Sequence, residues 1–246
     1  MPDIPTATTV SPGEDALPLA RHHQAMATIF GTKFLNTFVS PYLVIEDHVI
    51  ECPVGVRFFK KDFNFLSKQL YLEYQYRSWR DFDVALLDRY AGIITNKLAA
   101  LDATMQQTIN RLHKLLEQGG QPADLTLWPT KYVTDVPIIA AQARAYLAVL
   151  QKMDRVYTLA GTANLLGVID STQRAQAELQ ATRAVRTFRS VLQTEVARLH
   201  REAERITNEQ RQAGKTDPAM AAAVQQQAQE ITMFEQGMQE DVSIAV

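Results

Sequence analysis

The sequence predicts a mainly α-helical fold built around a unit in which one short β-strand precedes two helices. Three observations lead to this fold class. Apolar residues recur every three or four positions along most of the chain after residue 79, which is the period of an amphipathic helix. Glycine is scarce, with 10 residues in 246, and glutamine is abundant, which favours helix. Residues 70–77 instead alternate between polar and apolar side chains, as a half-buried strand does.

Composition narrows the classes of protein that fit. The chain has 46% apolar residues, enough for one sizeable core or two small ones, and a formal net charge of −2. Overall charge therefore gives no argument for nucleic acid, and any polyanion site must be a local patch or arise in a dimer. The only cysteine, Cys52, allows no disulfide within the chain. No apolar stretch approaches the ~20 residues that span a bilayer, and a signal-peptide pattern is absent, so we expect a cytoplasmic protein without a membrane partner.

The first 66 residues are predicted as two segments. Residues 1–18 form a flexible arm, because prolines recur there among small and acidic residues. Residues 19–66 form an extension with a short helix, and residues 41–66 fit either short strands or an extended loop. His48 and Cys52 lie four positions apart, but without a second cysteine or a recognised ligand spacing they do not predict zinc. We expect no metal and no cofactor.

Residues 67–118 are predicted as a DNA-binding unit. Leu70–Arg77 forms the strand, and Ser78 caps the helix that follows. Gly92 breaks this helix, and Thr95 caps a second one, which an uninterrupted apolar stripe carries to the end of the unit. An ordinary edge strand, or a helix, also fits the alternating run.

Residues 119–246 are predicted as a helical extension. Thr134 or Asp135 caps a helix that ends near residue 166, and Asp170 begins a helix that continues to about residue 213. A final helix covers residues 219–240. Between Ser171 and Lys215 the chain has eight arginines and one lysine against five glutamates. This basic helix is either a solvated face laced with ion pairs or a contact with phosphate or a partner.

An exposed strand that pairs with its twin in a homodimer forms a two-stranded ribbon, which fits the major groove of double-stranded DNA. A ribbon-helix-helix arrangement would follow, with one side of the ribbon packed on the helices. The predicted base-reading residues are Glu73, Gln75 and Arg77. The start of the second helix would offer free N–H groups and a cation to DNA phosphates. The predicted phosphate-binding residues are Thr95, Asn96, Lys97 and Arg80.

Recognisable catalytic chemistry is absent from the sequence. It contains no phosphate-cradling loop, nucleophile elbow, metalloprotease motif or dinucleotide fingerprint. The five histidines are scattered, and acidic residues pair only as sequence neighbours. We expect no catalytic residues, no small-molecule substrate and no enzyme activity.

Two resemblances bear on function. The run Glu73–Arg77, followed by Trp79-Arg80-Asp81, resembles ribbon-helix-helix repressors. The span of residues 71–206 resembles the AcaB-type transcriptional regulators of conjugative plasmids and integrative conjugative elements. The segments that carry this second resemblance are Tyr76–Trp79, Asp88–Gly92, Leu98–Leu116, Ala143–Leu147, Lys152, Asp154-Arg155 and Gly167–Ser171.

The AcaB-type resemblance implies a ribbon-helix-helix core within a larger helical protein. It also implies a dimeric regulator of conjugative-transfer genes. The alternative is a non-enzymatic helical scaffold that binds protein partners in a conjugative element.

Overall fold

The computed structural model describes residues 16–123 and 128–214, together with residues 218, 220–225, 228, 229 and 232. The predicted flexible arm, residues 1–18, lies almost wholly outside the described residues. So does much of the predicted final helix, although the residues described between 218 and 232 are helical. Among the described helices, none combines the length and apolar character that crossing a bilayer requires.

The chain forms two compact units. The first comprises residues 1–49 and 133–138, and the second comprises residues 50–132 and 139–246. In the first unit, helix α1 (Ala16–Phe30) is followed by the short helix α2 (Thr32–Thr37). Strands β1 (Leu43–Ile50) and β2 (Tyr132–Ile138) pair as a two-stranded antiparallel sheet.

One arginine ties the elements of the first unit together. The Arg21 guanidinium donates to both carboxylate oxygens of Asp135, each at 2.6 Å, and so connects α1 to β2. It also donates to Glu46 at 2.8 Å and to Asp47 at 2.7 Å in β1. The hydrogen bonds from Arg21 hold the pKa of Asp135 below its usual range. An ion cluster therefore fixes α1 against both strands.

The strand predicted for residues 70–77 is wrong, because these residues form the end of a helix. Helix α3 (Pro53–Phe58), the π-helix η1 (Phe59–Phe63) and helix α4 (Asn64–Arg77) follow one another without a break. The alternation misled because polarity does not mark the buried side of this helix. Its buried side includes the polar Ser67 and Gln69, whereas Tyr74 on its outer side is 61% exposed. No strand is present at residues 70–77 to form the predicted ribbon.

The breaks predicted between residues 78 and 95 are also displaced. Ser78 lies at the end of α4, where its hydroxyl donates to the Gln75 carbonyl at 2.7 Å. The next helix, α5 (Val84–Gln118), is capped by Asp83, whose carboxylate accepts from the backbone of the first turn. Gly92 and Thr95 lie exposed inside α5, and a single 35-residue helix replaces the two predicted ones. Its end at the glycine pair 119–120 confirms the prediction.

For the last two long helices, the structure agrees better with the prediction from the sequence. Thr134 and Asp135 belong to β2, so the predicted start of the third helix is wrong, and α6 (Ala141–Leu165) begins after the strand. The residues from 132 to 139 include five β-branched side chains, which suit a strand. Helix α7 (Ser171–Gln212) begins as predicted, since Asp170 forms a capping box with Gln173.

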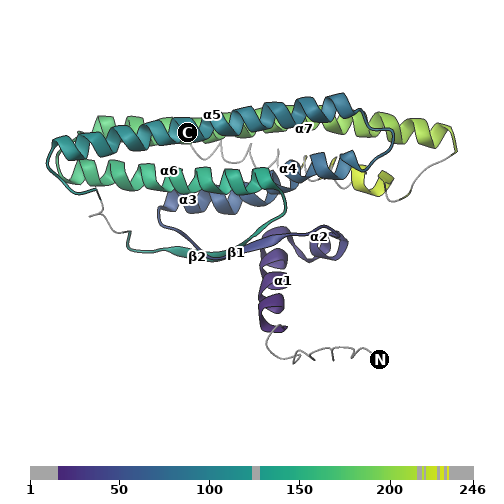
Figure 1. Ribbon diagram of the computed structural model, residues 1–246, viewed down its shortest axis with the longest axis horizontal. Coiled ribbons are helices and arrows are strands. Elements are labelled where there is room, and N and C mark those ends of the chain that lie inside the picture. The colour runs from purple at the N-terminus through teal and green to yellow at the C-terminus, as the bar shows by residue number, and fades with distance from the viewer. Residues whose placement is uncertain are drawn as a thin grey trace, which may run out of the picture. The chain divides into compact units, whose positions relative to one another are not determined.

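The core of the second unit is made by the long helices. Helices α5, α6 and α7 pack on one another, and α4 packs against all three (Figure 1). Helix α6 is the most enclosed, because every residue from 156 to 163 is buried. The Tyr90 hydroxyl of α5 donates to the Gln69 carbonyl of α4 at 2.9 Å. Parts of the outer side of the continuous helix from 53 to 77, such as Arg57, Lys60 and Tyr74, and one side of α7 are exposed.

Gly92→Ala is expected to raise the free energy of unfolding by about 0.5–1 kcal/mol, because alanine stabilises an exposed helix interior relative to glycine. A Cβ atom at residue 92 would meet nothing within 4 Å. Urea denaturation monitored by circular dichroism measures the change.

Gly167 offers a matched control, since it ends α6 with a φ of +71°. Gly167→Ala is expected to lower the free energy of unfolding by about 1–2 kcal/mol, because a side chain strains this backbone conformation. A loss of stability from Gly92→Ala would contradict the continuous helix α5.

Candidate nucleic-acid interface

The three predicted base-reading residues lie in the last turns of α4. Arg77 donates to Glu73 at 3.0 Å and to Asp88 of α5 at 2.9 Å, and these carboxylates raise its pKa. Residues 73 and 77 share one side of the helix, whereas Gln75 projects from a different side. The helix therefore does not bring the three side chains into the single row that a strand would have made. Their contact with DNA stays a prediction, without the ribbon geometry that motivated it.

The predicted phosphate-binding residues do not lie at a helix N-terminus. Thr95, Asn96 and Lys97 are exposed within α5, where a helix uses its N–H groups for its own hydrogen bonds. The proposed cradle of free N–H groups is therefore wrong. Arg80 is exposed in the corner between α4 and α5. Each side chain is accessible, but the helix N-terminus that would have strengthened phosphate binding begins at Asp83.

A buried ion pair joins the π-helix to α7. The Arg189 guanidinium donates to the Asp62 carboxylate at 2.9 Å, and their side chains are 10% and 1% exposed. Burial raises the pKa of Asp62, while the positive charges of Arg189, Lys61 and Arg186 oppose this rise. Burial raises the pKa of the Tyr146 hydroxyl in α6 well above its usual value. The charge of the nearby Asp62 raises this pKa further. Three cations from two elements thus surround one carboxylate.

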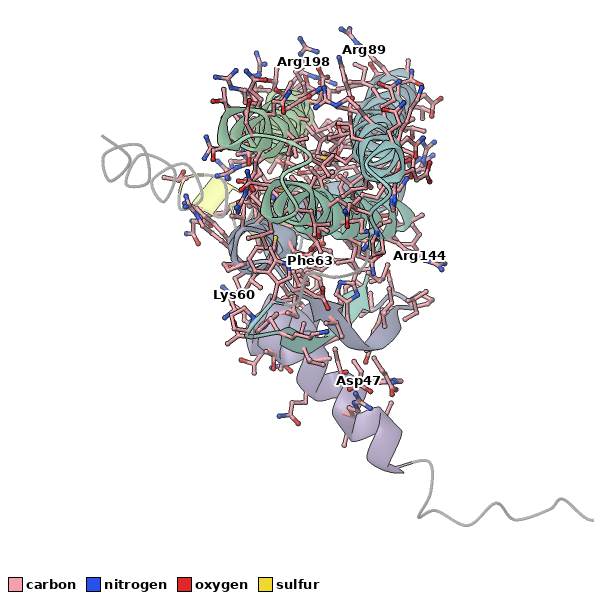
Figure 2. The ribbon with its side chains drawn as sticks, turned by 90° about the vertical axis from the view of Figure 1, so that its left-hand side faces the viewer. Asp47, Lys60, Phe63, Arg89, Arg144 and Arg198 are labelled. Carbon is pink, nitrogen blue, oxygen red and sulfur yellow. The ribbon has the colours of Figure 1, made fainter. Side chains whose placement is uncertain are left out.

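Basic side chains also lie along the two helices that this pair joins. We call them the basic strip, which consists of Arg57, Lys60, Lys61 and Lys68 from the continuous helix 53–77, and Arg183 and Arg186 from α7. Lys60 points away from the helices, whereas Phe63 of the same π-helix lies among them (Figure 2). Lys61 and Arg186 both act electrostatically on Asp62, and α4 packs against α7, so the two helices that carry the strip adjoin.

Acidic residues are missing from the segments that carry the strip. Residues 63–72 and residues 179–194 contain no aspartate or glutamate. The glutamates that bound these segments are engaged in ion pairs. Glu73 pairs with Arg77 at 3.0 Å, and Glu178 pairs with Arg174 at 2.8 Å. Within residues 53–72 and 179–194 the one acidic residue is therefore Asp62, which is buried.

The end of α7 shows the opposite arrangement. Arg205 forms ion pairs with Glu202 and Glu209, both at 2.6 Å, and Arg198 pairs with Glu195 at 2.6 Å. The hydrogen bond from Arg205 lowers the pKa of Glu202. The ion-pair interpretation of this basic helix thus applies to its last turns. Its last turns are laced with ion pairs, whereas the region from 179 to 194 is purely cationic.

None of the six strip residues was among the predicted site residues. The excess of arginine in residues 171–215 was a partial signal. The cations at 57, 60, 61 and 68 can be assigned to one row only when residues 53–77 are known to form one helix.

A second polar centre has a structural role. The Asp154 carboxylate accepts from the backbone N–H groups of Glu51 and Cys52, at 2.9 and 2.6 Å. The Cys52 sulfur accepts from the Gly55 N–H at 3.1 Å and caps α3. Burial and Asp154 raise the pKa of this thiol, so it stays protonated near neutral pH. In the part of the chain that the structure describes, no group of histidine, cysteine, aspartate and glutamate could hold a metal ion.

Comparison with known proteins gives one likeness, at the level of fold. The structure is similar to that of selenomethionine-containing AcaB from uropathogenic E. coli, with a TM-score of 0.57 and 17% sequence identity. The match covers 78% of this chain and 98% of the AcaB chain. No protein-family description and no curated sequence matches the chain. The fold is therefore distantly AcaB-like.

Asp62→Ala is expected to lower the free energy of unfolding by roughly 3–5 kcal/mol, because it leaves the Arg189 charge buried without its carboxylate. Chemical denaturation measures this loss. Arg174→Ala removes a partly exposed ion pair from the same helix α7 and is expected to cost about 0.5 kcal/mol. Equal effects of the two substitutions would contradict the importance of the buried pair.

Proposed function

We propose that this protein is a DNA-binding transcriptional regulator of conjugative-transfer genes, which acts as a homodimer and has no enzymatic activity or cofactor. The observation that carries the proposal is the basic strip. In a chain with a net charge of −2, six cations gather on two packed helices whose outer segments contain no acidic residue. DNA presents one negative charge per ~1.7 Å of its axis and attracts such a surface.

Two further findings support this function over other uses of a basic surface. The sequence resembles AcaB-type transcriptional regulators, and the fold is similar to AcaB over nearly the whole AcaB chain. The strip also stands on long helices held by a packed core, which fixes its side chains better than a loop would. The proposal does not include a ribbon at residues 70–77.

The scaffold function remains the alternative for this protein. The ion-paired end of α7 favours it, because alternating charges on a long exposed helix suit a partner protein as well as solvent. A scaffold without a nucleic-acid function would not need six cations on two packed helices. Binding to DNA, and its dependence on salt, distinguishes the two functions.

The protein is expected to bind a fluorescein-labelled duplex carrying the DNA upstream of its own gene, as measured by fluorescence anisotropy. Affinity should fall steeply with salt, because each phosphate contact adds about −0.9 to the slope of log affinity against log salt. The six strip cations of one protomer would give a slope as steep as about −5. Sedimentation should show a dimer. A folded protein that binds no duplex at low salt would refute the proposed function.

A further inference from the structure

The basic strip has two rows of cations, one on the continuous helix 53–77 and one on α7. The buried ion pair between Asp62 and Arg189 fixes the position of one row relative to the other. Asp62 sits in the π-helix, and Arg189 reaches it from α7 at 2.9 Å. Lys61 of η1 and Arg186 of α7 act electrostatically on the same carboxylate. Because a buried charge must keep its partner, η1 and α7 cannot slide past one another without a large cost. The cations of the strip therefore form a preorganised surface.

The length of the strip fits the spacing of phosphates. From Arg57 to Lys68 the helix advances 11 residues, which is about 16 Å at 1.5 Å per residue. One strand of B-DNA places a phosphate every ~3.4 Å along the axis. The row therefore spans about five phosphates of one strand. Arg183 and Arg186 add a second row on α7, one helical turn long.

The side chains of the strip suit phosphates better than base edges. Four are exposed, namely Arg57 and Lys60 on the continuous helix and Arg183 and Arg186 on α7, which packs against the α4 part of that helix. Base reading in the major groove depends on one helix or ribbon that inserts a few side chains between the backbones. A broad cationic surface on two helices instead tracks the backbone, where contacts fix position and carry no sequence information.

We propose that the basic strip is a sequence-independent contact with the phosphate backbone of double-stranded DNA, organised by the buried Asp62–Arg189 pair. This inference rests on the proposed function, DNA binding, and assigns to the strip the part of DNA binding that does not depend on sequence. The strip supplies affinity and register on the duplex, and it does not choose between sequences. Sequence discrimination then comes from residues outside the strip.

The test compares two labelled duplexes, one with the upstream sequence and one with the same composition in shuffled order. The two variants are Arg57→Gln with Lys60→Gln, and Arg183→Gln with Arg186→Gln. All four side chains are exposed, so thermal unfolding should confirm that each variant remains folded. Each double variant is expected to weaken binding to both duplexes by the same factor. The slope of log affinity against log salt should become shallower by about 1.8, for two lost phosphate contacts.

Matched controls come from cations outside the strip. Arg205→Gln removes an exposed arginine of the same α7 helix that already pairs with Glu202 and Glu209. Lys114→Gln removes an exposed cation on α5. Both are expected to leave the affinity for each duplex and the salt slope unchanged.

The outcomes separate the inference from the proposed function. If the unaltered protein binds neither duplex, the proposed function fails. If it binds but the strip variants keep its affinity and slope, the inference is wrong and the function stands. The inference is also wrong if the variants lose affinity for the upstream duplex alone, because the strip would then read sequence. Tighter strip-dependent binding to duplex RNA or to phosphatidylserine vesicles would overturn it as well.

Discussion

The ion pair between Asp62 and Arg189 is the interaction on which the arrangement of the second unit depends. It connects residues 127 positions apart, and both partners are nearly inaccessible. Charges in such a place persist only when they are paired, and removing one partner costs more than the pair itself contributes. The π-helix turns Asp62 inward together with Phe59 and Phe63. The register between η1 and α7 follows from this contact, and so does the surface above it.

The positive charge of the basic strip depends on the residues beneath it and on those along its two helices. A buried carboxylate balances part of the positive charge from within, while the outer segments of both helices lack acidic residues. Farther along α7, each strong arginine contact is matched by a glutamate three or four positions away. The same helix thus combines a cationic region with a neutral one. A near-neutral chain can in this way present a local field suited to a polyanion.

Sequence reasoning predicted the helical features that local signals determine. The cap at Asp170, the glycine stop after α5 and the stripe from residue 98 to 116 all appear as expected. It failed where tertiary contacts decide. Gly92 is tolerated within α5 at a cost of about 1 kcal/mol because the buried residues of that helix outweigh it. The strand at residues 70–77 failed because the enclosed side of α4 contains Ser67 and Gln69. The basic strip escaped prediction for a related reason, since its members come from segments over 100 positions apart.

The most direct test of this account is to map which lysines DNA covers. Acetylation of the folded protein with a water-soluble reagent, with and without duplex DNA, can be followed at each lysine by mass spectrometry. The account predicts slower labelling of Lys60, Lys61 and Lys68 when DNA is present, and unchanged labelling of the exposed Lys114 on α5. Protection of Lys114, with the strip lysines labelled as before, would contradict it.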